Sequence, residues 1–405
     1  MAAASEGHEL IELLSFNKEE DLTCSICLDL LTAPKTLPCG HTFCQDCLLE
    51  HAAVQVPSVC PLCRFAIKTP PGGIPNLPNG RLDPNVYDTI KNLEKHEDKW
   101  IECRTFGGTG SQRGQFRGPR GLAVSDRGEI FVADYRNKRV QVFDFQGTFL
   151  SSFYTVLPEE DIYPYGLTLD SGGNIWVTGR ASGSTARSSK SSSFALLDYF
   201  GMTTNSSQYD REISSSSSSR DFAVLYTRQG RYLIHFDIQK TRWAARGVAM
   251  DTSENNVVVT KVNDGGDSVV QVFKPNGTLL KTIGDQQGME YPHYVTVDKE
   301  GRVLVSDSAG PYVYVYDKEG EFLFKFGGWG EGEGQLNRPH GICTDTSGRI
   351  FVADSGNDRV DMFDSRGGFL SHAISDIKQP LSVVMTRRRN LVVSNSENVV
   401  TIFHN

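Results

Sequence analysis

Seven cysteines and one histidine lie close together near the N-terminus, in pairs whose spacing suits a metal ion. From residue 24 to residue 63 the pattern reads C-x2-C-x11-C-x-H-x2-C-x2-C-x12-C-x2-C. A two-residue gap lets a tight turn direct both thiolates at one ion, and two such pairs complete a tetrahedral zinc site. Eight ligands therefore predict two zinc ions, and binding each should supply on the order of 10 kcal/mol of folding free energy to this short segment.

The rest of the chain favours metal binding over disulfides. The sequence starts without a basic and then apolar leader, and it has no uncharged run long enough to span a bilayer. We therefore expect a cytoplasmic protein, or a nuclear one, with reduced thiols and no membrane association. The 405 residues, of which 39% are hydrophobic, leave room for two or three folded domains.

The cysteine segment resembles the RING fingers of tripartite-motif proteins. Three cysteines, one histidine and four cysteines follow in that order, within the wording EEDLTCSICLDLLTAPKTLPCGHTFCQDC. RING ligand pairs interleave around two zinc ions. The resemblance implies Cys24, Cys27, Cys44 and Cys47 at one zinc, and Cys39, His41, Cys60 and Cys63 at the other. It also implies the activity of a ubiquitin ligase, which binds a ubiquitin-loaded conjugating enzyme and forms no covalent intermediate.

Residues beside the zinc ligands bear on that implied activity. Ile26, Pro61 and Leu62 match the apolar RING residues that contact the conjugating enzyme. Arg64 matches the residue that in active RINGs hydrogen-bonds both that enzyme and ubiquitin, a bridging role that suits a planar guanidinium and accelerates transfer by positioning. Alternatively, the apolar residues only cover the zinc sites and Arg64 is a solvated charge. His51 replaces a large apolar residue of many RINGs, which leaves the choice of conjugating enzyme open.

Helical patterns flank the cysteine segment on both sides. HELIELLSF at 8–16 has its apolar residues on one side, and DPNVYDTIKNLEKHEDK at 83–99 follows the turn-rich TPPGGIPNLPNG. Similar helices pair two RINGs in tripartite-motif proteins, so the resemblance implies a homodimer; alternatively, each helix packs only on its own RING. The B-box and long coiled coil of that family find no counterpart in this sequence.

A pattern of four short strands recurs from residue 106 onward. The residues that precede the first strand of each unit are Pro119, Pro164, Ala245, Pro292, Pro339 and Pro380. Most intervals are near 45 residues, the period of a propeller blade, so six blades are expected. The one long interval contains a serine-rich insertion at about 180–220 in blade two, and its composition predicts a mobile loop.

The repeats, with IFVADSGNDRVDMFD near consensus, resemble NHL repeats. The last unit provides three strands, while KWIECRTFGG at 99–108 resembles the fourth strands, so we expect this segment to close the ring. The expected fold is multidomain, a small zinc-bound α+β RING finger followed by an all-β six-bladed NHL propeller. The expected ranges are a helix at 1–20, the RING at 21–66, a linker and helix at 67–99, and the propeller at 100–405.

One mouth of the propeller channel is the candidate recognition face. The residues that open the first strands there are Arg120, Tyr165, Arg246, His293, His340 and Leu381. The loop between the second and third strands of blade one adds Tyr135, Arg136, Lys138 and Arg139. These side chains suit a protein substrate or single-stranded RNA, or they simply cap the strand starts.

The charge of the propeller and the types of side chain at its mouth help to distinguish a protein ligand, RNA and a metalloenzyme site. Residues 100–405 hold 33 basic and 35 acidic residues, a net of −2 that favours a protein ligand over RNA. His293 and His340 lack a third ligand on the inner ring, which argues against a metalloenzyme. Apolar surroundings predict that Cys103 and Cys343 are buried. A non-catalytic scaffold with an inactive RING is the remaining alternative.

Overall fold

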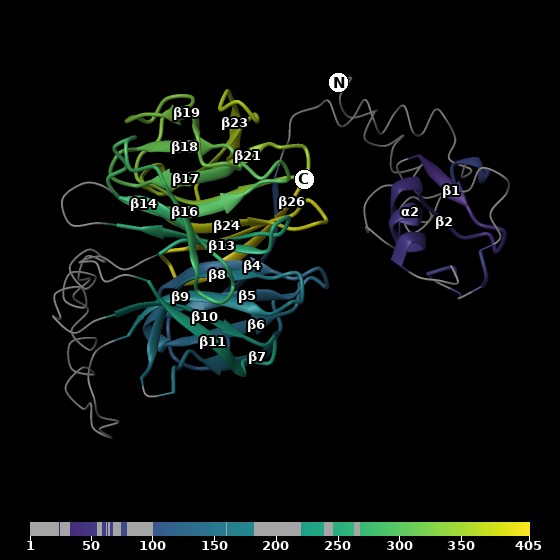
Figure 1. Ribbon diagram of the computed structural model, residues 1–405, viewed down its shortest axis with the longest axis horizontal. Coiled ribbons are helices and arrows are strands. Elements are labelled where there is room, and N and C mark those ends of the chain that lie inside the picture. Colours follow the sequence, from purple (N-terminus) through teal and green to yellow (C-terminus); the bar gives the residue numbers. More distant parts are fainter. Residues whose placement is uncertain are drawn as a thin grey trace, which may run out of the picture. The chain divides into compact units, whose positions relative to one another are not determined.

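The computed structural model forms two compact units, Met1–Asp98 and Lys99–Asn405 (Figure 1). It describes residues 24, 33–54, 59–61, 63, 65–67, 74–78, 100–158, 160–181, 220–238, 246–262 and 268–405. Among these residues, no helix has the length and apolar character needed to cross a bilayer. The expected flanking helices at 8–16 and 83–99 and most of the serine-rich insertion lie outside the described residues.

The first unit is a small α+β zinc-finger fold. Strands β1 (Pro34–Thr36) and β2 (Thr42–Cys44) form a hairpin, helix α2 (Gln45–Val54) follows directly, and a short 3-10 helix η2 spans Ile74–Asn76. Leu37, Phe43 and Leu48 are buried together with several of the cysteines. Because the described part of this unit buries few apolar side chains, we expect its metal sites to contribute to its stability.

Residues 74–78, expected to belong to a linker, pack onto this hairpin. Ile74 and Leu77 are buried in the same apolar cluster. The Lys35 ammonium donates to the Pro75 carbonyl at 2.8 Å, and the Thr36 N–H donates to the Pro78 carbonyl at 2.9 Å. The zinc-finger fold therefore includes this segment.

The second unit is a propeller of six four-stranded antiparallel sheets. Blade one holds β4 (Pro119–Val124), β5 (Ile130–Asp134), β6 (Arg139–Phe143) and β7 (Phe149–Tyr154); blade two holds β8 (Ile162–Leu169), β9 (Ile175–Ala181), β10 (Arg220–Tyr226) and β11 (Tyr232–Ile238). Blade three holds β12 (Val248–Asp251), β13 (Asn256–Lys261), β14 (Val269–Phe273) and β15 (Leu279–Ile283); blade four holds β16 (Pro292–Val297), β17 (Val303–Asp307), β18 (Tyr312–Tyr316) and β19 (Phe322–Gly327). Blade five holds β20 (Pro339–Thr344), β21 (Ile350–Asp354), β22 (Arg359–Phe363) and β23 (Phe369–Ile374).

Blade six closes the ring with a strand from the other end of the sequence. Its first three strands are β24 (Pro380–Met385), β25 (Leu391–Asn395) and β26 (Val399–His404), and its fourth is β3 (Ile101–Gly107). The antiparallel ladder pairs Val399 with Gly107 and His404 with Ile101. The first strands also contact one another around the ring, including β24 with β4. The expected closure by the N-terminal strand is confirmed.

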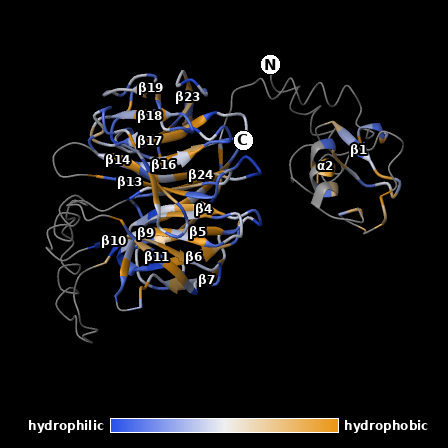
Figure 2. Ribbon diagram, in the orientation of Figure 1, coloured by the Kyte–Doolittle hydropathy of each residue, from blue (hydrophilic) through white to orange (hydrophobic). Residues whose placement is uncertain are grey.

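Burial explains the continuous apolar runs of the second strands. Every residue of β5 and of β21, both IFVAD, is buried, because neighbouring blades cover both faces of these strands. Outer strands such as β7 and β19 lie at the edges in Figure 1 and expose single apolar side chains such as Leu150 and Leu323. Figure 2 shows orange, hydrophobic stretches along strands β5 and β17 and blue segments in many connecting turns.

Cys103 and Cys343, the two cysteines outside the zinc-finger segment, differ in exposure. Cys343 is buried in β20, as expected, and burial raises the pKa of its thiol. The expectation for Cys103 is wrong, because this residue lies exposed on β3, with its sulfur 2.5 Å from Nδ1 of His404. The physical reason is its position on an outer strand, where no further strand covers the side chain.

Candidate zinc centre and recognition face

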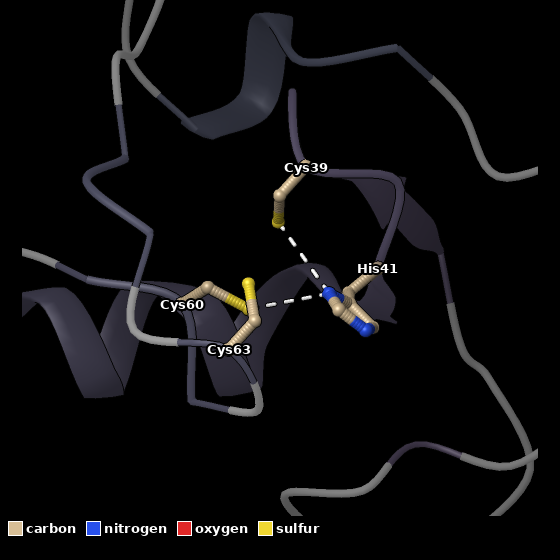
Figure 3. Close-up of side chains that lie close together, drawn as sticks. All are labelled: Cys39, His41, Cys60 and Cys63. Atoms are coloured by element: carbon tan, nitrogen blue, oxygen red, sulfur yellow. Dashed lines mark hydrogen bonds between the residues drawn. The ribbon is translucent and has the colours of Figure 1, made fainter.

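Four ligand atoms of the zinc-finger unit have the separations of a zinc site. Cys39, His41, Cys60 and Cys63 each direct one ligand atom toward a common centre, with all four atoms within 4.8 Å of one another (Figure 3). Nδ1 of His41 lies 3.5 Å from the Cys39 sulfur and 3.7 Å from the Cys60 sulfur. Zinc bonds of about 2.0 to 2.3 Å at tetrahedral angles give ligand separations of roughly 3.5 to 3.8 Å. These contacts are therefore the edges of a tetrahedron that fits zinc.

A second group comprises Cys24, Cys44 and Cys47, whose sulfurs also lie within 4.8 Å of one another. Its expected fourth member, Cys27, lies outside the described residues. The N–H of Cys44 donates to the Cys24 sulfur at 3.4 Å, an interaction that favours the thiolate needed for metal binding. The two groups alternate along the sequence, as the interleaved RING pairing requires.

The expected conjugating-enzyme contacts are only partly described. Pro61 is exposed next to buried Cys60, whereas Ile26, Leu62 and Arg64 lie outside the described residues. Nε2 of His51 lies 3.0 Å from the Val59 carbonyl oxygen, and this hydrogen bond links helix α2 to the residue before the zinc ligand Cys60. The unusual histidine thus has a structural role, and the enzyme-contact role of the other four residues stays a prediction.

The residues expected at the channel mouth come together as a ladder of cations and aromatic rings. The Arg120 guanidinium lies 5.0 Å from the ring centroid of Tyr135 and 5.4 Å from that of Tyr165. The Arg246 guanidinium lies 5.0 Å from the Tyr165 ring and 5.1 Å from the Tyr291 ring. Tyr165 therefore contacts both guanidinium groups, at distances where cation–π attraction is favourable.

Two histidines continue the ladder. The centroid of the His293 ring lies 5.1 Å from that of Tyr291 and 4.2 Å from that of His340. His293 is only 5% exposed, and among the described residues neither of its ring nitrogens has a hydrogen-bond partner. Burial lowers the pKa of His293 well below its usual value, and the nearby charges of His340, Arg246 and Arg120 lower it further. The imidazole is therefore neutral at neutral pH.

The blade-one loop contributes unequally to this face. Tyr135 is buried in the ladder, and its hydroxyl accepts a hydrogen bond from the Tyr165 hydroxyl at 3.0 Å. Arg136 is exposed. The Lys138 ammonium lies 4.8 Å from the Tyr163 ring and 3.3 Å from an Asp161 oxygen.

Arg139 does not belong to an exposed face, contrary to expectation. Its Nε donates to Asp134 at 2.8 Å, and its Nη2 donates to the carbonyls of Gln112 and Gln115. Blade five repeats this arrangement with Asp354 and Arg359. The D-x4-R spacing occurs in both blade one and blade five. A pair of residues repeated in two blades is more readily explained by a role in the blade fold than by ligand binding, so this spacing could have identified Arg139 as a framework residue.

Tyr294 and Tyr291 are members of the mouth that sequence reasoning missed. Where β16 carries Tyr294, the corresponding positions of blades one, two, three and five are the glycines Gly121, Gly166, Gly247 and Gly341. A Cβ at Gly166 would lie 2.4 Å from the Arg246 carbonyl, so these strands approach too closely for side chains. Comparison of the repeats at this one position would have singled out Tyr294.

Comparisons with known proteins agree with this architecture. The RING-type zinc-finger model matches residues 24–63, and the NHL repeat model matches residues 116–143 and 336–360. The chain therefore combines a RING-type zinc finger with NHL repeats, as its resemblance to those families predicted.

Several curated relatives are tripartite-motif proteins. The chain is 35% identical over 117 residues to "E3 ubiquitin-protein ligase TRIM56" of Homo sapiens, a match that covers 27% of this chain and 15% of that protein. It is 47% identical over 96 residues to "Tripartite motif-containing protein 5" of Hylobates lar, covering 21% of this chain and 20% of that protein. The chain thus spans no more than about a fifth of the length of these relatives.

Solved structures resemble the propeller in fold alone. A protein of unknown function from Bacteroides thetaiotaomicron is 10% identical, with a TM-score of 0.50 over 74% of this chain and 76% of that one. Virginiamycin B lyase from Staphylococcus aureus is 11% identical, with a TM-score of 0.48 over 76% of this chain and 99% of that one.

Proposed function

We propose that this protein is a RING-type E3 ubiquitin-protein ligase. The observation that carries the proposal is the pair of interleaved cysteine and histidine groups with zinc-site separations, in a segment that matches the RING-type zinc finger. Two zinc ions would stabilise the finger, and the finger would bind a ubiquitin-loaded conjugating enzyme. The relative TRIM56 is named an E3 ubiquitin-protein ligase.

In this proposal Ile26, Pro61 and Leu62 contact the conjugating enzyme. Arg64 contacts both the enzyme and ubiquitin, and holds the thioester in a reactive pose. The RING would form no covalent intermediate with ubiquitin during transfer, so the rate gain would come from positioning alone.

The propeller would recruit a protein substrate at the mouth that contains Arg120, Tyr165 and Arg246. The net charge of −2 over residues 100–405 supports a protein ligand, because single-stranded RNA requires a continuous basic track. The loop with Glu331 and Glu333 lies between β19 and β20, on the same side of the propeller as the mouth, and its charges would repel a polyanion.

Autoubiquitination of the full-length protein with a panel of conjugating enzymes tests the ligase assignment. We expect transfer by the wild type with at least one enzyme, and a loss of about tenfold or more in Arg64→Ala because one charge-assisted bridge is removed. Lys68→Ala is the control, because Lys68 is a nearby basic residue with no proposed contact to the conjugating enzyme or ubiquitin, and this variant should transfer normally. A wild-type protein inactive with every enzyme would leave a zinc-containing binding protein.

The RING-flanking helices would form a homodimer. Multi-angle light scattering of the full-length protein across micromolar concentrations measures this directly. A monomer at all concentrations would refute the dimer without affecting the ligase assignment.

A further inference from the structure

We propose that the channel mouth, which we name the cup, binds one anionic side chain of a protein ligand, a carboxylate or a phosphoryl group. The inference rests on the proposed recruitment of a protein by the propeller and specifies the chemistry that is recognised. It is carried by three features of the mouth: its floor, its cationic walls and the unpartnered imidazole of His293.

Tyr294 forms the floor of the cup. Its hydroxyl donates to the Arg120 carbonyl at 2.7 Å. Tyr294 belongs to blade four and Arg120 to blade one, and in a six-bladed ring these blades lie on opposite sides of the channel. The side chain therefore crosses the channel where four other blades have glycine. Beyond it, a cavity of about 220 Å³ is lined mainly by apolar side chains such as Leu122, Val248 and Ile342.

The walls of the cup are cationic and held in place. The aromatic faces of Tyr165 and Tyr291 contact the Arg246 guanidinium, and the Tyr291 hydroxyl accepts a hydrogen bond from it at 2.7 Å. The backbone is fixed as well, because the Thr178 hydroxyl donates to the Arg246 carbonyl at 2.9 Å. Cations held against aromatic rings bind an anion without losing further side-chain freedom.

His293 is the observation that points to a ligand. A buried imidazole with no hydrogen bond at either nitrogen is costly, and such groups in native proteins call for an explanation. A ligand oxygen in the cup would accept a hydrogen bond from the one N–H of the neutral His293 ring. Arg120 and Arg246 on neighbouring sides favour a negatively charged oxygen over a neutral one.

The surroundings of the cup select a single anionic group rather than a polyanion. The mouth contains the two guanidinium groups of Arg120 and Arg246, whereas residues 100–405 as a whole carry a net charge of −2. The Tyr294 side chain spans the channel, so it limits how deep a ligand can enter. One aspartate, glutamate or phosphorylated residue on an otherwise neutral or basic segment would match both the local positive charge and the limited depth of the cup.

Tryptophan fluorescence offers a direct test, because all four tryptophans lie at or after residue 100 and report only on the propeller of the full-length protein. Thermal unfolding is followed at constant ionic strength with N-acetyl-phosphoserine amide, N-acetyl-glutamate amide or the neutral N-acetyl-glutamine amide. At least one anionic probe should raise the transition temperature saturably, and the neutral probe should not. The responding probe distinguishes a phosphoryl group from a carboxylate.

Variants of the mouth separate the cup from other basic surfaces. The saturable shift should be lost in Arg246→Gln and in His293→Phe, and partly retained in Arg246→Lys. Arg387→Gln is the matched control: Arg387 lies in the turn between β24 and β25, on the opposite side of the propeller, and is exposed. It should respond as the wild type does. The ligand-free unfolding curve of each variant shows whether it folds.

Three results would overturn the inference. These are no saturable shift with either anionic probe, equal shifts in the wild type and in the folded mouth variants, or a steeply salt-dependent affinity for dodecauridylate RNA that the same variants abolish. No conjugating enzyme or ubiquitin is present in this measurement. Failure of the cup therefore leaves the ligase assignment standing, and failure of ubiquitin transfer leaves the cup standing.

Discussion

The pair formed by Arg180 and Asp221 should contribute strongly to the stability of blade two. Arg180 Nε and Nη2 donate to the two carboxylate oxygens of Asp221 at 2.6 and 2.7 Å. The side chains are 1% and 0% exposed. They lie at adjoining ends of β9 and β10, on either side of residues 182–219, so the pair fixes the base of that connection at the recognition face.

Removal of one partner should cost far more than removal of both. Arg180→Ala leaves the Asp221 carboxylate buried without its cation, and we expect a loss of about 3 to 5 kcal/mol in the free energy of unfolding. In Arg180→Met/Asp221→Leu both members of the pair are replaced by apolar side chains, so most of that loss should be recovered. Arg387→Ala breaks an ion pair whose side chains are 74% and 70% exposed, and it should cost less than about 1 kcal/mol.

Urea unfolding of the full-length protein, followed by tryptophan fluorescence, measures these differences for the propeller alone. The comparison is made at fixed pH and salt, with a shared slope against urea concentration. An Arg180→Ala variant within 1 kcal/mol of the wild type would refute the reasoning. A double variant no more stable than Arg180→Ala would also refute it.

Three further predictions concern closure, protonation and metal. Deletion of residues 100–106 should abolish the cooperative tryptophan transition, whereas an unchanged transition would refute closure by β3. Burial raises the pKa of the Asp354 carboxyl to about 6, and the charge of Asp361 raises it further. The folded state therefore favours the protonated carboxyl. As pH rises from about 4 to 6, the free energy of unfolding should fall by up to about 1.4 kcal/mol per pH unit. Asp361→Asn should reduce this slope in urea titrations, and an unchanged slope would contradict the assignment. A chelator should release two zinc ions per chain, measured with a metal-sensitive dye, and leave the propeller's tryptophan transition unchanged; release of fewer ions would contradict two sites.

The blade framework and zinc ligands followed from the sequence because each depends on local spacing. A two-residue gap between cysteines brings both sulfurs to one ion, and a run such as IFVAD is buried wherever two blades cover it. The closing strand was also recognisable, since its residues repeat the pattern of the other fourth strands.

The features that the sequence did not reveal depend on contacts between distant blades. The path of Tyr294 across the channel requires the Arg120 carbonyl, 174 residues away, as its partner. The expected burial of Cys103 overlooked its place on the outer strand β3, between the charged residues Glu102 and Arg104. Arg139 looked like a ligand-binding cation because the segment around it is basic, but its charge is satisfied within the blade.

The pairing of β3 with β26 also governs when the propeller can form during synthesis. β3 leaves the ribosome early, but its partner begins only at Val399, after nearly 300 further residues. At about 5 to 20 residues per second, this separation means that β3 waits roughly 15 to 60 s for its partner. Throughout that interval one edge of an unclosed sheet is open to other strands. The zinc finger, complete by residue 78, can acquire its metal long before the propeller closes.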